Sequence, residues 1–255
     1  MNRLRLLLLI IPESILYMIF MCMDITGTNA GISSVLKYAS ILICMIFAAS
    51  GAIPCMRRGA FPGRKNVGLL LAAALICTAF SDYFLLFEEN ILPGLISFCV
   101  VQTVYLVVIC GARVKKAAII LGVRLVLTAI AAVTAVMLVG PDGADPDAIP
   151  VIAAAGFYAI SFLGNILHLI IDIAGTKDRS CLFARPVMFA AGLILFLLCD
   201  VNVLIFNLDG YIDVGSAAFD TVKNVSSVLM WAFYLPSQVL IVLSGSCREA
   251  DRKPA

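Results

Sequence analysis

The sequence has few charged residues for its length. Only 13% of the 255 residues are charged, 62% are hydrophobic and the mean hydropathy is +1.07, whereas a soluble domain carries about 25% charged residues. This composition excludes a soluble globular domain and predicts an integral membrane protein. The net charge of +2 is close to neutral and the basic residues fall in short loops, so nothing indicates a nucleic-acid partner.

Residues that bind metals are also scarce. Because His168 is the only histidine, a zinc centre built from three histidines is impossible. The nine cysteines form no CxxC pair and lie mostly inside apolar segments, as buried inert thiols do. The sequence therefore predicts no metal ion and no other cofactor.

Long apolar runs separated by short polar breaks make up most of the chain, and each run is long enough to cross a bilayer as a helix. The expected spans cover residues of about 5–23, 34–55, 67–87, 91–111, 117–139, 150–174, 186–208 and 225–245. No break is long enough for a soluble domain. We expect an all-α polytopic membrane protein, in which residues 1–255 form one domain and a single bundle of eight transmembrane helices.

The charges of the loops alternate along the chain. Fifteen of the eighteen basic residues lie at one set of loops and ends: Arg3, Arg5, Arg57, Arg58, Arg64, Lys65, Arg113, Lys115, Lys116, Lys177, Arg179, Arg185, Arg248, Arg252 and Lys253. The opposite loops are acidic: Asp24, Glu88, Glu89, Asp142, Asp145, Asp147, Asp209, Asp213 and Asp220. By the positive-inside rule the basic side is cytoplasmic, so we expect both termini in the cytoplasm and the protein in the plasma membrane.

Two aspartates interrupt the apolar spans. Asp82 lies six positions before Glu88 and Asp200 nine positions before Asp209, which places both in the outer half of the membrane. An ionisable side chain is expensive in lipid unless it faces the interior of the bundle. If the two share a pocket, burial and mutual repulsion would keep one carboxyl protonated and the other ionised, as general acid–base catalysis requires.

An alternative is that each aspartate bonds a neighbour on its own helix, such as Thr78 one turn before Asp82, and only fixes packing. A faint internal repeat connects the two regions. Asp82 and Asp200 are each followed by an acidic outer loop and then by a span with a buried glutamine, Gln102 or Gln238. Two shared polar positions could also arise by chance.

Uncharged polar residues occur in the fourth, sixth, seventh and eighth spans. Gln102 and Tyr105 share one helix face, and Tyr234 and Gln238 share another, with a kink expected at Pro236. The residues expected to bind a substrate are Gln102, Tyr105, Asn165, Asn202, Tyr234 and Gln238. For any one of them, hydrogen bonding between helices is the alternative role.

The sixth span carries a polar stripe at helical spacing, which must face protein or water because lipid cannot satisfy it. Its members are Tyr158, Ser161, Asn165, His168 and Asp172. We expect Asp172 to form a structural salt bridge with Arg124 of the fifth span. Glu13, beside Pro12 in the first span, either lines a cavity or is bonded locally.

Three blocks in order resemble the YhhN family of lysoplasmalogenase-like membrane proteins: FSDYFLLFEENILPGLISFCVVQTVYL, LILFLLCDVNVLIFNL and FYLPSQVLIVLSG, which together span Phe80 to Gly245. The resemblance implies eight helices, with Asp82 and Asp200 matching the two acids of the family, Tyr105 and Tyr234 its tyrosines and Gln238 its glutamine. Two positions depart from the pattern. Gln102 stands where the family commonly has histidine, and Cys199 stands where it usually has serine.

The resemblance implies a hydrolase that cleaves the vinyl ether bond of lysoplasmalogens to a fatty aldehyde and a glycerophospho-base. Two aspartates, one acid and one base, suit this chemistry without a cofactor, as paired carboxylates do in glycoside hydrolysis. The expected partners are a lysophospholipid-like substrate and the lipid bilayer. The alternative function is a non-catalytic membrane carrier or sensor of a lipid or small solute, in which the same acids bind a cation or relay protons.

Overall fold

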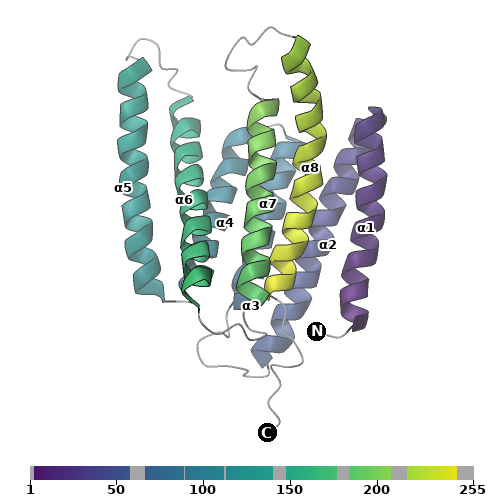
Figure 1. Cartoon of the computed structure of the whole chain (residues 1–255), viewed down its shortest axis with the longest axis horizontal. Helices are drawn as coiled ribbons and strands as arrows, with labels where there is room; N and C mark the ends of the chain where they lie inside the picture. Colours follow the sequence, from purple (N-terminus) through teal and green to yellow (C-terminus); the bar gives the residue numbers. More distant parts are fainter. Residues whose placement is uncertain are drawn as a thin grey trace. The chain divides into compact units, whose positions relative to one another are not determined.

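The structure, a computed structural model, describes residues 3–57, 67–88, 90–111, 113–139, 148–176, 184–207 and 217–245. Within these residues every regular element is a helix and no strand occurs (Figure 1). The helices are α1 (Arg3–Thr26), α2 (Ala30–Arg57), α3 (Val67–Leu86), α4 (Ile91–Ile109), α5 (Val114–Val139), α6 (Ala148–Gly175), α7 (Ala184–Phe206) and α8 (Ala217–Gly245). All eight are long and apolar enough to cross a membrane, which confirms the all-α fold class.

The last helix begins earlier than the sequence predicted. The expected span started at residue 225 and left Asp209 to Asn224 as a loop, but α8 starts at Ala217. Hydropathy detects only the part of a helix that lipid surrounds, so a polar first turn is missed. Asp220 lies in that turn, where a carboxylate is favourable beside the free backbone N–H groups of a helix N-terminus.

Several charged loop residues on which the expected orientation depends lie outside the described residues. They are Arg58, Arg64, Lys65, Glu89, Asp142, Asp145, Asp147, Lys177, Arg179, Asp209, Asp213, Arg248, Arg252 and Lys253. The orientation of the termini therefore stays a prediction.

Short turns with left-handed backbone separate some of the helices. Gly27 after α1 has φ of 64°, Asn29 before α2 has φ of 52° and Gly111 after α4 has φ of 61°. Glycine adopts this conformation without a steric penalty and is the usual residue just beyond a helix C-terminus. These residues therefore stop α1 and α4 where the apolar runs end.

The contacts between residues divide the chain into two units, which are described separately. Unit 1 contains α1, α2 up to Phe47, α7 and α8. Unit 2 contains the rest of α2 together with α3, α4, α5 and α6. The assignment of residues 1–255 to a single domain stays a prediction.

In unit 1, α7 and α8 form a close antiparallel pair, and they lie side by side in Figure 1. A Cβ atom on Gly192 of α7 would lie 2.8 Å from Cγ1 of Ile241 and 3.0 Å from the backbone oxygen of Ser237. Only glycine allows the two helices to come so close. Further along the pair, the rings of Phe196 and Tyr234 meet edge to face at 5.4 Å.

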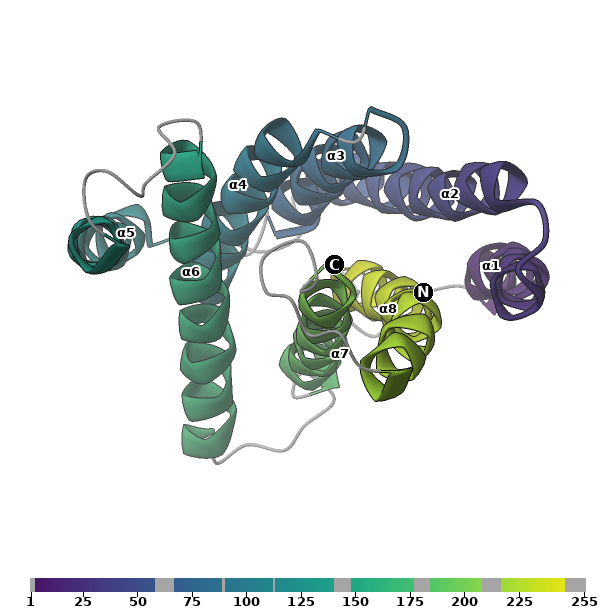
Figure 2. The ribbon, with the colours of Figure 1, turned by 90° about the horizontal axis from the view of Figure 1, so that it is seen from above.

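In unit 2, α4 is the central helix. It packs against α3 and α6, and α5 packs against α6, as the view from above shows (Figure 2). The buried face of α4 repeats at helical spacing through Gly94, Ser97, Phe98, Val101, Gln102 and Tyr105. The polar residues of this face are therefore enclosed by protein.

Candidate functional site

Two hydroxyl groups fix the register of α3 against α4 in unit 2. The Ser81 hydroxyl donates to the backbone oxygen of Gly94 at 2.6 Å, and the Ser97 hydroxyl donates to that of Cys77 at 2.7 Å. The two helices therefore run antiparallel, with residue 81 opposite residue 94. This register places Asp82 beside the first turns of α4.

Asp82 is buried on the packed face of α3, with only 4% of its surface exposed. Thr78, one turn earlier, donates its hydroxyl to the backbone oxygen of Ala74 at 3.0 Å. A hydroxyl has a single proton to donate, so Thr78 does not hold the carboxylate of Asp82. The local packing role considered for this pair is therefore not supplied by Thr78.

Gln102 and Tyr105 lie deeper along α4 than Asp82. Gln102 is eight positions after Gly94, which corresponds to roughly 12 Å along the helix axis. Both Gln102 and Tyr105 are fully buried. Side chains lean toward the N-terminus of their own helix, so Asp82 and Gln102 lean toward each other from antiparallel helices without sharing a level.

A hydrogen-bonded chain of three buried side chains joins α4, α5 and α6. Arg124 Nη1 donates to Asn165 Oδ1 at 2.9 Å. Asn165 Nδ2 in turn donates to the backbone oxygen of Gln102 at 2.9 Å and to its Oε1 at 3.0 Å. The structure thus brings together two predicted site residues, Gln102 and Asn165, with Arg124 as a third member.

The expected salt bridge between Arg124 and Asp172 is not formed. Arg124 lies against Gly164 and bonds Asn165, two turns from Asp172, because α5 runs antiparallel to α6. Asp172 instead lies near His168, with 3.8 Å between its Oδ2 and Nε2 of the ring. Hydropathy gives the depth of a residue in the membrane only to within a few positions. The register of α5 against α6 decides which side chain Arg124 meets.

The polar stripe of α6 faces the neighbouring helices of unit 2 along most of its length. Tyr158 packs against Phe98 of α4 with 5.8 Å between ring centroids. Ser161 and Asn165 are buried, and the hydroxyl oxygen of Ser161 has no hydrogen-bond partner among the described residues. Only at the end of the stripe is a side chain well exposed, that of Asp172 at 53%.

In unit 1, Asp200 lies one turn after Phe196 on α7, on the side that meets α8. It is half-buried, and the antiparallel register places it beside the turn of α8 that precedes Tyr234. Its neighbour Cys199 is buried. Asn202 is buried too, but its Nδ2 donates to the backbone oxygen of Leu198 at 2.7 Å, so its amide protons are partly used within α7.

Tyr234 and Gln238 lie on the inner face of α8. Tyr234 is enclosed between Phe196 of α7 and Trp231 of its own helix, with ring centroids at 5.4 and 5.3 Å. Gln238, one turn further, is fully buried, and neither its Nε2 nor its Oε1 has a hydrogen-bond partner among the described residues. Asp200 and Gln238 therefore lie roughly 6 Å to either side of the Phe196–Tyr234 contact along the helix axes.

The proline of α8 explains how α1 attaches to it. Pro236 has no N–H, so the carbonyl of Ala232, four residues earlier, lacks its helical partner. The hydroxyl of Tyr17 on α1 donates to this carbonyl at 3.3 Å. The expected disturbance at Pro236 is thus used to anchor a neighbouring helix.

A buried ion pair, which the sequence did not suggest, ties α1 to α2 in the same unit. Lys37 Nζ lies 2.8 Å from Asp24 Oδ2, and the hydroxyl of Ser33 donates to Asp24 Oδ1 at 2.6 Å. The ammonium also lies over the ring of Trp231 at 4.7 Å, which adds α8 to the contact.

Glu13 faces α2 rather than lipid. It is 3% exposed, and Cys44 Sγ donates to its Oε1 at 3.3 Å. Its Oε2 has no hydrogen-bond partner among the described residues. Glu13 is thus held from α2, by Cys44 and by the nearby Ser40, rather than by a group beside Pro12 on its own helix. That Glu13 lines a cavity stays a prediction.

The sequence model of the YhhN family matches residues 32–245, which is most of the chain. The chain belongs to the YhhN family. No curated protein and no solved structure matches it. The match begins within α2 and ends with α8, so it includes all eight predicted site residues of this YhhN-family chain.

The two aspartates of this YhhN-family protein lie in different units, Asp82 in unit 2 and Asp200 in unit 1. That they share one pocket therefore stays a prediction, as do their catalytic roles. In the part of the chain that the structure describes, no three histidine, cysteine, aspartate or glutamate side chains come together as a metal site. The absence of a metal in the working protein also stays a prediction.

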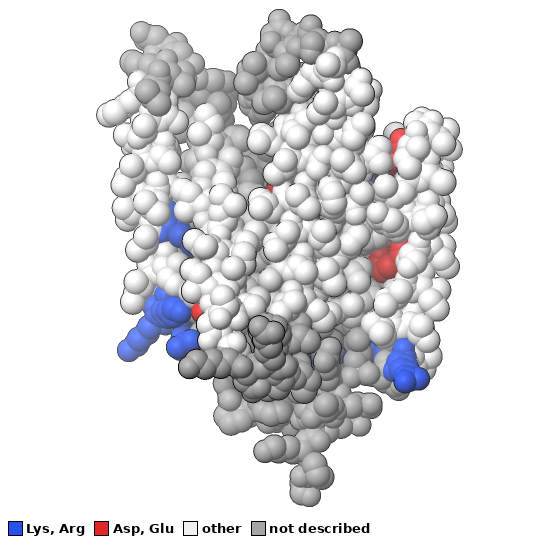
Figure 3. Space-filling view, viewed as in Figure 1, with Lys and Arg blue, Asp and Glu red and all other residues white. Residues whose placement is uncertain are grey.

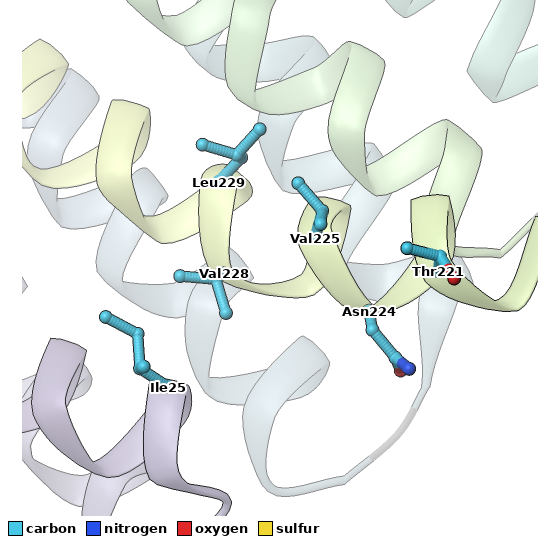
Figure 4. Close-up of a pocket in the computed structure, with 6 residues that line it drawn as sticks. All are labelled: Ile25, Thr221, Asn224, Val225, Val228 and Leu229. Atoms are coloured by element: carbon cyan, nitrogen blue, oxygen red, sulfur yellow. The ribbon is translucent and has the colours of Figure 1, made fainter.

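An open groove of 380 Å³ lies between the end of α1 and the first turns of α8 in unit 1 (Figure 4). Four of its lining residues are aliphatic, namely Ile25, Val225, Val228 and Leu229, and two are polar, Thr221 and Asn224. The polar pair lies nearer the beginning of α8. The aliphatic part continues along α8 toward the turn that contains Trp231.

Proposed function

We propose that this protein hydrolyses the vinyl ether bond of lysoplasmalogens, with Asp82 and Asp200 as the acid and base. The coarser part, an integral membrane protein of the YhhN family, rests on the family match and the eight apolar helices. Support for the finer part comes chiefly from Gln238. A fully buried amide whose two polar atoms have no partner among the described residues is costly, and a bound polar group beside Tyr234 would satisfy it.

The reaction that we propose needs one proton donor, one proton acceptor and one water molecule. A protonated aspartate gives its proton to the β-carbon of the vinyl ether, which leaves an oxocarbenium ion. The ionised aspartate accepts a proton from water as the water oxygen attacks the α-carbon, giving a hemiacetal. The hemiacetal collapses to a fatty aldehyde and the free hydroxyl of the glycerophospho-base, so atoms and charge balance without a cofactor.

The groove between α1 and α8 suits the single hydrocarbon chain of such a substrate. It opens between two helices that are long and apolar enough to cross a membrane, and its aliphatic lining matches an acyl or alkenyl chain. Thr221 and Asn224 at its end provide hydrogen-bonding groups for the polar part of a lipid. The groove thus supports a lipid rather than a small water-soluble substrate.

Aldehyde release from a purified lysoplasmalogen by the full chain in detergent tests the proposal. We expect aldehyde and glycerophospho-base in equal amounts. The matched control is the 1-alkyl lysolipid, which has the same head group and chain but no vinyl double bond to protonate and should not be cleaved. No aldehyde from any lysoplasmalogen, or equal cleavage of the alkyl analogue, would refute vinyl ether hydrolysis.

A membrane carrier or sensor is the second candidate, and Glu13 is the observation that favours it. Hydrolysis by two aspartates leaves this third intramembrane acid without a task, whereas acids in transporters relay protons or bind cations. A proton flux across proteoliposomes that depends on added lipid or solute and is lost in Glu13→Gln would favour this function. A flux unaffected by that substitution would remove its support.

A further inference from the structure

Basic side chains gather at one end of unit 2, where α4 ends and α5 begins, and the proposed hydrolysis does not use them. In Figure 3, Lys and Arg atoms collect at the lower end of α5 and α6, with another patch higher on the same helices. Arg113, Lys116 and Arg124 all lie close enough to the buried sulfur of Cys110 for their charges to act on it. Among the described residues, the acid that acts there with them is Asp172.

Several side chains at this end have N–H groups that are not used in the hydrogen bonds of the described residues. Arg113 uses its Nε to donate to the backbone oxygen of Cys110 at 3.1 Å, which leaves both of its Nη groups. Lys116 Nζ lies 3.0 Å from His168 Nε2. An ammonium group can only donate, so Nε2 accepts and the ring proton is on Nδ1, where it is available as another donor.

Arg124 lies deeper and carries a buried charge. It is 5% exposed, and its guanidinium lies so close to Gly164 that a Cβ atom there would be 2.8 Å from Nη2. Its hydrogen-bond partner is the neutral amide of Asn165, and no carboxylate of the described residues lies within ion-pair distance. A buried guanidinium without an anion is expensive.

Asp172 does not supply the missing anion. Its side chain is 53% exposed and lies 3.8 Å from His168, while Arg124 is bonded further along α6. The end of unit 2 therefore combines several unused donors with a positive charge deeper in the bundle that has no carboxylate of the described residues within ion-pair distance.

We propose that this end of α4, α5 and α6 binds a phosphate group, that of an anionic phospholipid in the adjacent leaflet. Arg113, Lys116 and the Nδ1–H of His168 contact the phosphate oxygens, and Arg124 supplies the charge behind them. Several donors from different side chains match the several oxygens of a phosphate. Basic pockets between transmembrane helices bind lipid head groups in the same way.

Lipid binding measured by native mass spectrometry tests this site without reference to hydrolysis. The full chain is purified in detergent and titrated with phosphatidylglycerol or phosphatidylcholine of the same chains. We expect tighter binding of phosphatidylglycerol, and a loss of about fivefold in its affinity in Lys116→Gln, the effect of one basic residue near an anionic lipid. Lys116→Arg should retain the affinity, which guards against a fault in folding.

Lys115 offers a matched control because it is adjacent and exposed, and is not among the charges that act on Cys110. Lys115→Gln should leave the affinity unchanged. Equal losses in Lys115→Gln and Lys116→Gln would mean general attraction to the surface and would overturn the site. Equal affinities of the wild type for the two lipids, together with no binding of inorganic phosphate, would overturn it as well.

Inorganic phosphate distinguishes the two sources of a phosphate group. If inorganic phosphate displaces phosphatidylglycerol from the wild type but not the lipid that still binds to Lys116→Gln, the site is supported. That result also shows that the site accepts the phosphate of a lipid as well as free phosphate. If it has no effect while the preference for phosphatidylglycerol stands, the site is specific for lipid. Binding of free phosphate alone, lost in Lys116→Gln, supports the site and assigns it to the free anion.

Discussion

The pair α3–α4 of unit 2 and the pair α7–α8 of unit 1 carry the same types of polar residue, but different contacts hold the two helices of each pair together. In each, the first helix carries an aspartate, Asp82 or Asp200, and the second a fully buried glutamine, Gln102 or Gln238. The first pair is held by two serine hydroxyls bonded to backbone oxygens of the opposite helix. The second is held by ring contacts and by close packing at Gly192.

The two glutamines show what this difference means. Gln102 accepts one hydrogen bond from Asn165 at its backbone oxygen and one at Oε1, and Asn165 is itself held by Arg124. The Nε2 of Gln102 has no hydrogen-bond partner among the described residues. Gln238 has no partner for either polar atom among the described residues. The same residue type is thus part of a hydrogen-bond network in one pair, because Asn165 of α6 reaches it, and lacks a partner among the described residues in the other.

Substitution of either aspartate should have the largest effect on turnover, and the effect should be similar for the pair α3–α4 and the pair α7–α8. Asp82→Asn and Asp200→Asn preserve volume but cannot exchange a proton as the acid does, and each should lower aldehyde release by about 10²–10⁴-fold. Turnover is compared at matched expression and matched melting temperature. Survival of activity to within about tenfold in one variant would remove that aspartate from the mechanism.

Loss of Asn165 should destabilise unit 2 through the buried arginine. Asn165→Leu leaves Arg124 without its acceptor and Gln102 without its donor, a cost of about 1–3 kcal/mol or more because one group is charged. The melting temperature of the purified protein should fall clearly. Asn207→Leu is the control, since Asn207 is exposed and donates only within its own helix. Equal melting temperatures for both would contradict the structural role of the network.

The two contact glycines should respond unequally to alanine. A Cβ atom on Gly192 would meet the rigid backbone oxygen of Ser237 at 3.0 Å, whereas one on Gly94 would come no nearer than 3.3 Å to a backbone atom and would meet the movable side chain of Leu85 at 3.0 Å. We expect Gly192→Ala to cost about 1–3 kcal/mol and Gly94→Ala less. Melting temperatures in the opposite order would show that the register of the pairs is misassigned.

The smallest effect is expected in the groove of unit 1. Val228→Trp fills it and should raise KM for a lysoplasmalogen with kcat unchanged, because the chain is held equally before and during the reaction. Val222→Trp on the same helix, exposed but outside the groove, should leave both constants alone. Equal changes in the two variants would separate the groove from substrate binding.

The sequence predicted the eight helices because a bilayer imposes both length and apolar composition on each span. It also predicted the burial of Asp82, Gln102 and Gln238, since polar groups in such spans must face protein. The start of α8 was missed because its polar first turns resemble a loop in hydropathy. The correct predictions and the missed start of α8 have the same cause, because all of them were derived from the preference of each residue for lipid or water.

The hydrogen-bond and ion-pair partner of a buried side chain was harder to predict than its depth in the membrane. The pairing of Arg124 with Asn165 rather than Asp172, and the ion pair of Lys37 with Asp24, depend on the rotation and register of helices that are far apart in sequence. Neither the rotation nor the register of a helix can be derived from composition or periodicity. For the same reason Gln102 and Gln238 were predicted alike as substrate-binding residues, although their surroundings differ.

The measurement that tests the contrast between the two glutamines most directly compares Gln102→Leu with Gln238→Leu. Each purified variant is examined for its melting temperature and for its affinity for the uncleaved 1-alkyl lysolipid. Removing an unpartnered buried amide is neutral or stabilising, so Gln238→Leu should keep the melting temperature and lose the ligand, whereas Gln102→Leu should lower the melting temperature and keep the ligand. The reverse pattern, or equal effects of the two substitutions, would contradict the assignment of Gln238 to the ligand and of Gln102 to the structure.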